Sequence, residues 1–250
     1  GQNNRRGYFF QNGGYYLAPS DYFDLTLLGD YYTNGSYGMR VESSYRKRYA
    51  FNGRLSLRFE NLIDGERGLP GYSKSNIYNI RWSHSQDSKA NPYNRFSASV
   101  NLGSSNYFRE SLNQINTPNF LNNTLNSSVS FSKTFRGYPS VNVSLTASHS
   151  QNTRSKTVNL VLPTFQGNVE RVYPFVKKNG QKKGFFKNIN LQYTFRGENR
   201  INTTDSLFFK KGMFDDAKYG MKHTIPLSTN FKVMKHFSVS VNGNFEEIWT

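Results

Sequence analysis

Arginine is the residue type whose spacing in this sequence most clearly predicts a site. Four arginines occupy polar positions in three successive segments that alternate polar with apolar residues, namely Arg40, Arg54, Arg58 and Arg81. Alternate residues of a strand share one face, so these guanidinium groups are expected on one face of a sheet. A guanidinium pairs with phosphate or carboxylate through two parallel hydrogen bonds. The row therefore predicts either a basic track for phosphorylated or acidic cargo, or a ladder of ion pairs that braces the wall.

Other residue types give no pattern for catalysis, metal binding or a cofactor. The four histidines show no metal-ligand spacing, and the sequence has no cysteine. The adjacent acids Asp215-Asp216 and Glu246-Glu247 project to opposite faces of a strand or lie in a loop, which does not suit an acid–base pair. Phosphate-binding loops, nucleophile elbows and the His-Glu-x-x-His zinc motif do not occur. We therefore expect a protein that is not an enzyme, with no catalytic residues, no metal and no cofactor.

The segments that would carry the arginines are predicted to be long β-strands. Arg95–Gly103 shows the pattern most clearly, because every second residue from Phe96 to Leu102 is apolar and those between are small and polar. About twelve such segments are predicted, at Tyr8–Ala18, Phe23–Tyr32, Tyr37–Arg46, Ala50–Glu60, Ile77–Ser85, Arg95–Gly103, Asn123–Lys133, Val141–Ser150, Thr157–Leu162, Asn188–Gly197, Tyr219–Leu227 and Phe237–Glu247. Pro163 interrupts the ninth, which could continue past a kink toward Phe175.

The connections between these segments alternate between short turns and long loops. Long loops rich in Asn, Gly and Ser are expected over Leu62–Asn76, Asn106–Asn122 and Glu198–Lys218, and only Thr33–Ser36 and Gln151–Lys156 are expected to be short on that side. Short turns at one rim and long loops at the other are typical of outer-membrane barrels, whose long loops face outward. Ten residues at about 3.3 Å each, tilted near 45°, span roughly 23 Å, close to the apolar height of such a barrel. The pattern favours an all-β, antiparallel transmembrane barrel over a soluble β-sandwich, which also alternates.

The composition agrees with strands that are apolar on one face and wet on the other. Hydrophobic residues make up 36% of the chain, fewer than the roughly 45–50% of a globular domain. No run of about 18 apolar residues predicts a membrane helix. The net charge of +16 is spread through strands and turns, so we expect outer-membrane lipids, and no nucleic acid, as its partner. His84, His149 and His223 fall at apolar positions late on strands, which favours a place in aromatic girdles.

Three stretches of sequence, taken in order, carry a family resemblance. In Gly14–Thr26 an aromatic strand ends at a proline turn and is followed by Asp-Leu-Thr. Trp82–His84 is followed by Arg95–Phe108, and Ile225–Ser228 comes later. The first stretch resembles the early barrel strands of the lipopolysaccharide-assembly outer-membrane protein, the LptD family. The second is similar to the family's next hairpin and loop, and the third to a later strand end.

The resemblance implies a barrel of about 26 strands with a plug lipoprotein inside. Lipopolysaccharide would arrive from periplasmic bridge proteins through a jelly-roll domain. It would leave sideways, between the first and last strands, into the outer leaflet of a Gram-negative outer membrane. Residues 1–250 are then expected to be a partial barrel domain, its N-terminal half, with the jelly roll and closing strands outside this chain. Two alternatives stay open: a general outer-membrane channel or receptor for solutes, and a surface β-sandwich adhesin.

By this resemblance the first predicted strand, Tyr8–Ala18, lies beside the lateral opening. Its gate residues are expected to be Gly13, Gly14, Tyr15 and Tyr16. Family members carry prolines in the first strands that weaken the gate, and this chain has glycine in comparable places. Glycine also weakens strand pairing, so we expect valine or threonine at both glycines to strengthen it.

Overall fold

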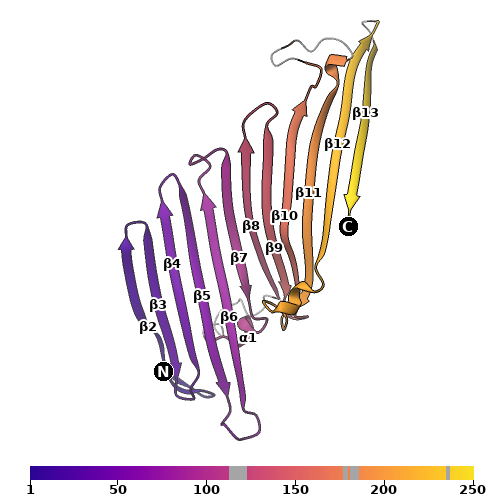
Figure 1. Ribbon diagram of the computed structural model, residues 1–250. Helices are drawn as coiled ribbons and strands as arrows, with labels where there is room; N and C mark the ends of the chain where they lie inside the picture. The colour runs from indigo at the N-terminus through magenta and orange to yellow at the C-terminus, as the bar shows by residue number, and fades with distance from the viewer. Residues whose placement is uncertain (113–122, 177–179, 181–185, 235–236) are drawn as a thin grey trace.

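The computed structural model describes residues 1–112, 123–176, 180, 186–234 and 237–250. Within them the chain forms one antiparallel sheet of thirteen strands, each paired with its neighbours in sequence. The strands are β1 (Gln2–Asn3), β2 (Gly7–Ser20), β3 (Phe23–Tyr32), β4 (Tyr37–Lys47), β5 (Phe51–Asp64), β6 (Ser73–Gln86), β7 (Asn94–Gly103), β8 (Thr124–Phe135), β9 (Val141–Asn152), β10 (Thr157–Val172), β11 (Asn190–Thr204), β12 (Lys218–Val233) and β13 (Phe237–Trp249). Figure 1 shows them side by side from β2 to β13. The predicted all-β, antiparallel class is confirmed.

Helical structure in the described residues is confined to three short pieces. They are α1 (Tyr107–Glu110) and the 3-10 turns η2 (Phe186–Asn188) and η3 (Lys211–Phe214). No helix in this part of the chain is long and apolar enough to cross a membrane.

All twelve predicted strands are present, and β3 matches its prediction at both ends. Most others are longer than predicted, because cross-strand pairing continues past the clean alternation. β5 and β6, for example, stay paired as far as Asp64 and Ser73, so the predicted loop over Leu62–Asn76 shortens to residues 65–72. The two-residue β1 was not predicted.

β10 shows why strand length was the least predictable feature. It runs through Pro163 to Val172, as the prediction of a continuation past a kink allowed. Its register against both β9 and β11 shifts between Val161 and Thr164. Proline has no N–H to give to the ladder, and a bulge lets the strand pass it without ending.

The two rims of the sheet differ in most of their connections, as predicted. Residues 21–22, 48–50 and 136–140 are turns at one rim, the short-turn rim, and residues 65–72 and 205–217 are loops at the other, the long-loop rim. At the long-loop rim, residues 33–36 and 153–156 are short turns, as predicted. The departure from the prediction is segment 173–189, which joins β10 to β11 at the short-turn rim and lies partly outside the described residues.

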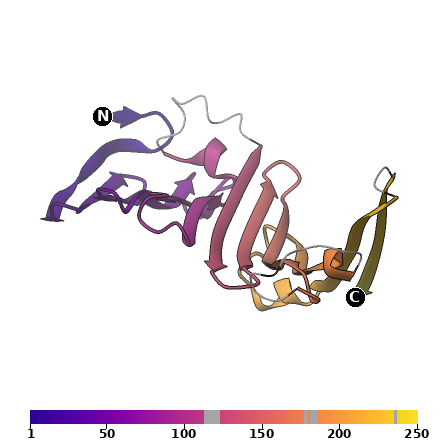
Figure 2. The ribbon, with the colours of Figure 1, turned by 90° about the horizontal axis from the view of Figure 1, so that it is seen from above.

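Alternation gives the sheet an apolar face and a polar face. Met39, Leu57 and Leu145 belong to the apolar face and are 61%, 36% and 44% exposed. Asp30, Arg40, Arg58, Arg81 and Ser144 belong to the polar face. Exposed large apolar side chains along a whole sheet face are costly in water and favourable in lipid. Seen from above, the sheet is curved and α1 lies against it (Figure 2).

Two small apolar clusters pack at the long-loop rim. In the first, Tyr107, Phe108 and Leu112 pack with wall residues Tyr32, Leu62, Ile77 and Leu125. In the second, Phe208 and Met213, from the segment that contains η3, cover Val158, Leu160 and Ile201 of β10 and β11. Loops at this rim therefore fold back onto the wall.

Candidate functional site

Strands β4, β5 and β6 bring the four predicted arginines onto the polar face. Arg40 of β4 lies directly opposite Arg58 of β5. Arg81 of β6 lies opposite Ser56, which is two residues from Arg58 toward the short-turn rim. Arg54 lies another two residues toward that rim on β5. Two-residue steps keep side chains on one side of a strand, so the four form one row. Their surroundings nevertheless divide them into different roles.

Arg58 is buried between two carboxylates. Its Nη2 donates to Asp30 Oδ2 at 2.9 Å, and its Nε donates to Glu60 Oε1. The side chains of Arg58 and Asp30 are 5% exposed, and that of Glu60 is 0% exposed. A cation enclosed in this way fixes the geometry of its partners and is closed to a ligand. The geometry at Arg58 therefore fits the wall-bracing alternative.

Arg40 is half-buried and braces the wall from β4 to β2. Its Nη2 donates to Asn12 Oδ1 of β2 at 2.8 Å, and its Nε lies 3.5 Å from Glu42 Oε1. The contact with Asn12 crosses over β3, which lies between the two strands in the sheet. Arg40 thus connects the row of arginines to the strand at the edge.

Arg54 and Arg81 line a cavity on the polar face. The cavity has a volume of about 570 Å³, and Asn101 and Phe108 also line it. The Arg81 guanidinium carbon lies 5.5 Å from the centroid of the Phe108 ring, a cation–π distance. Two guanidinium groups around one solvent-filled cavity can bind a phosphate or carboxylate group in a bidentate manner. Of the predicted row, this pair is open to a ligand.

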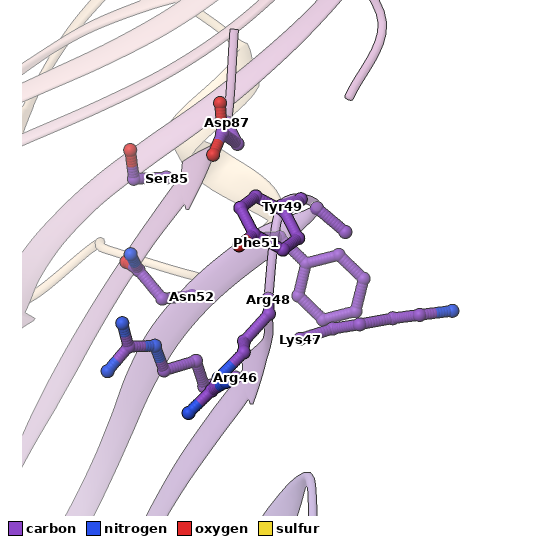
Figure 3. A pocket seen from close by; sticks show the side chains of 9 residues that line it. Arg46, Lys47, Arg48, Tyr49, Phe51, Asn52, Ser85 and Asp87 are labelled. Carbon is purple, nitrogen blue, oxygen red and sulfur yellow. The ribbon is translucent and has the colours of Figure 1, made fainter. Parts of the chain in front are cut away.

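A second basic cavity lies at the short-turn rim, at the turn between β4 and β5. Its volume is about 410 Å³, and Arg46, Arg48, Asn52 and Asp87 are among its lining residues. Figure 3 shows the Lys47 side chain pointing away from those of Arg46 and Arg48. Sequence reasoning missed this turn as a site, although three consecutive basic residues, Arg46 to Arg48, were a signal. Both cavities include residues of β4, β5 and β6, and the cavity of Arg54 and Arg81 extends to β7 and Phe108.

The predicted gate residues lie on β2, near the edge of the sheet. On one side β1 pairs with Gly7 and Tyr8 of β2, and Gly1 exchanges backbone hydrogen bonds with Phe9. On the other side β2 pairs with β3. That pairing shifts register between Phe10 and Gly13, and Asn12 within the shift has a φ of 58°. Tyr15 and Tyr16 are 77% and 66% exposed. A bulged strand is held less firmly than a regular one, because the ladder is interrupted at the bulge.

The expectation that valine or threonine at both glycines would strengthen pairing is wrong for Gly14. A Cβ there would lie 1.8 Å from the backbone oxygen of Leu27, so the two strands would have to separate. At Gly13 a Cβ would meet the Phe10 ring, a side chain that can move. Gly14 is therefore required by the close approach of β2 to β3, a constraint that sequence alone does not reveal.

The histidines sit among aromatic rings. His84 Nδ1 is 2.9 Å from the Tyr45 hydroxyl, and its ring lies against Phe51 and Phe96. His223 contacts Phe195 in the same way, and His149 stacks on Phe208. His236 lies outside the described residues. Among the residues that the structure describes, no cluster of three or more His, Cys, Asp or Glu residues could hold a metal ion.

Sequence reasoning missed the residues that complete the surroundings of Arg58. Ser111 Oγ and the Leu112 N–H both donate to the carboxylate of Glu60, at 2.7 and 2.8 Å. Asp30 was not singled out, although it is an acid at a polar position of β3. The contribution of residues 104–112 had no sequence signal, because a loop's path is set by tertiary packing.

A long antiparallel sheet of neighbour-paired strands, apolar and exposed on one face and polar on the other, is the wall of an outer-membrane β-barrel. Within that class, a family model described as LptD protein matches residues 1–250, and the chain belongs to that family. The resemblance seen in the sequence is thereby confirmed. A search of curated proteins gave no match. Family membership assigns the chain to lipopolysaccharide transport and outer-membrane assembly in Gram-negative bacteria, as part of a transport and assembly barrel.

Proposed function

We propose that this protein is a translocon that inserts lipopolysaccharide into the outer leaflet through a lateral opening beside β2. The observation that carries the proposal is the state of β2. Its pairing with β3 is bulged at Asn12, which has a positive φ, and the strand presents exposed Tyr15 and Tyr16. A bulge interrupts the ladder of hydrogen bonds, so a bulged strand separates from its neighbour more easily than a regular strand does.

The open arginines supply a place for the cargo's charged part. The phosphates of lipopolysaccharide are anions, and the cations Arg54 and Arg81 both line one cavity. Glu42 also lines the cavity and offsets part of the charge. We assign cargo contact to Arg54 and Arg81, and wall bracing to Arg40 and Arg58.

The partner proteins and the remaining parts of the barrel are inferred from the family to which the chain belongs. A plug lipoprotein would fill the barrel interior, and periplasmic bridge proteins would deliver cargo from the short-turn rim, where Arg46 and Arg48 line the second basic cavity. Residues 1–250 would form the N-terminal half of the barrel, with a jelly roll and closing strands contributed from outside this chain.

The test is export by the full-length protein with Arg54 and Arg81 both changed to glutamine. We expect a lower rate of lipopolysaccharide arrival at the cell surface, with the amount of folded protein in the outer membrane unchanged. The matched control changes Arg196 and Arg200 to glutamine. These exposed arginines lie on the polar face of β11, where both pair with Glu198.

Three outcomes separate the candidates. Loss of export in the first variant and not in the control supports the translocon. Unchanged export in both variants contradicts cargo contact at this pair. Normal export with an altered conductance for small solutes favours the channel alternative.

A further inference from the structure

Residues 104–112, here called the inner loop, fold against the polar face instead of projecting from the long-loop rim. At its start, the Ser104 N–H donates to the Tyr78 carbonyl oxygen at 3.0 Å. At its end, Ser111 and Leu112 both donate to Glu60, whose side chain is completely buried. The loop is therefore bound to the wall at both ends.

Apolar packing holds the middle of the inner loop in place. Tyr107, Phe108 and Leu112 are each less than 10% exposed and pack with Tyr32 and Ile77 of the wall. Phe108 also lines the cavity of Arg54 and Arg81, where the Arg81 guanidinium lies over its ring. The loop thus touches the proposed cargo cavity on one side and the buried charges on the other.

A chain of hydrogen bonds runs from the inner loop to the bulge of β2. Glu60 accepts from the loop and from Arg58, and Arg58 donates to Asp30 Oδ2. The other Asp30 oxygen, Oδ1, accepts the N–H of Asn12 at 2.8 Å. Asn12 is the residue with positive φ in the bulge. Direct hydrogen bonds or ion pairs therefore connect Leu112 to Asn12 without interruption.

The charge balance of this group makes its parts depend on one another. Among the ion pairs of the described residues, the buried carboxylates of Asp30 and Glu60 both pair with Arg58, and neutral donors meet part of the remaining negative charge. Ser111 and Leu112 supply such donors to Glu60, and Asn12 supplies one to Asp30. Departure of the inner loop would remove two donors from Glu60 and leave more uncompensated negative charge around Arg58 and Asp30. A buried charge that loses its partners costs far more than a neutral group does.

We propose that the inner loop controls β2. When the loop is docked on the wall, it holds the β2 bulge in place through Glu60, Arg58 and Asp30. When the loop is released, the bulge is free to move. The inference deepens the proposed lateral opening and rests on it for its biological meaning. A cargo phosphate that recruits Arg81 removes its contact with Phe108 and so favours release of the loop. Asp30, Arg58 and Glu60 are positioning residues in this device.

Hydrogen–deuterium exchange of the full-length protein in lipid nanodiscs, with its natural partner, tests the coupling. The two readouts are peptides covering residues 104–112 and residues 9–14. Glu60→Gln removes the buried charge, and Ser111→Ala removes a single donor of the loop and leaves the ion pairs intact. Each variant is expected to raise the exchange rate in both peptides by about tenfold, the scale of one hydrogen bond to a charged group. Glu198→Gln, which breaks two arginine pairs on β11, is the matched control and should change neither.

The outcomes separate this inference from the proposed function. Faster exchange in the inner loop with unchanged exchange in residues 9–14 would overturn the coupling, and Ser111→Ala decides the matter if Glu60→Gln does not fold. Coupled exchange together with an altered export rate supports both ideas. Coupled exchange with normal export supports the coupling and contradicts a role for β2 as the exit.

Discussion

Arginine at Leu145 should destabilise the barrel far more than arginine at the adjacent Ser144. Leu145 lies on the apolar face of β9, opposite Phe131 and Phe165, and is 44% exposed. Ser144 lies on the polar face, opposite Ser132 and Gln166. The two variants introduce the same residue at adjacent positions of β9, so a difference between them tests the assignment of the two faces.

The magnitude follows from the depth of Leu145 in the membrane. It is four residues from Val141, where β9 begins, and about 3.3 Å per residue at a tilt near 45° places it about 9 Å from that end. This depth is close to the middle of the apolar band, where a lipid-facing arginine costs about 2–4 kcal/mol. The expected change is roughly 30- to 700-fold in the unfolding equilibrium constant. Arginine at Ser144 should change stability by less than about 0.5 kcal/mol, as surface changes do.

The assay is urea titration of the full-length protein folded into phospholipid vesicles, followed by tryptophan fluorescence and by the gel-mobility shift of folded barrels. Leu145→Arg should move the midpoint to lower urea, and Ser144→Arg should leave it near that of the wild type. Equal shifts for the two variants would refute the assignment of lipid and interior faces.

Three further predictions concern single residues of the wall. Gly14→Ala should speed proteolysis of β2 because its Cβ would collide with the Leu27 oxygen, whereas Gly29→Ala, with no atom closer than 3.7 Å, should not; equal rates would contradict the close approach of β2 to β3. Arg58→Gln should cost about 3–5 kcal/mol in the same urea titration because two buried carboxylates lose their cation, and a loss as small as that of Arg54→Gln would show that Arg58 is not enclosed. Phe208→Ala should cost about 3 kcal/mol and expose residues 205–217 to protease, because Phe208 is 8% exposed and anchors that segment to the wall; unchanged protection would contradict this anchoring.

Period-two alternation was enough to predict the sheet, because it depends on local sequence alone. It placed Arg40, Arg54, Arg58 and Arg81 on one face, as the register shows. Strand ends were harder, since pairing with a neighbour can carry a strand beyond its alternating part. β10 crosses Pro163 because a bulge removes the need for that residue's N–H.

Which arginines are enclosed by carboxylates and which line an open cavity was not predictable, because this depends on residues distant in sequence. Arg58 is enclosed by Asp30 and Glu60, and Glu60 in turn by the inner loop 51 residues later at Ser111. The collision that forbids a side chain at Gly14 depends on how closely β2 approaches β3. Tertiary contacts of this kind leave no local pattern in the sequence.

The most direct test of the account is site-specific photocrosslinking at Arg81 in living cells that synthesise lipopolysaccharide. A photoreactive residue at position 81 of the full-length protein should form an adduct with lipopolysaccharide, and the adduct should disappear when delivery across the periplasm is blocked. The same residue at position 200, exposed on the polar face of β11, should give little adduct. Absence of any adduct at position 81 in a variant that still exports lipopolysaccharide would contradict the passage of cargo along the arginine row.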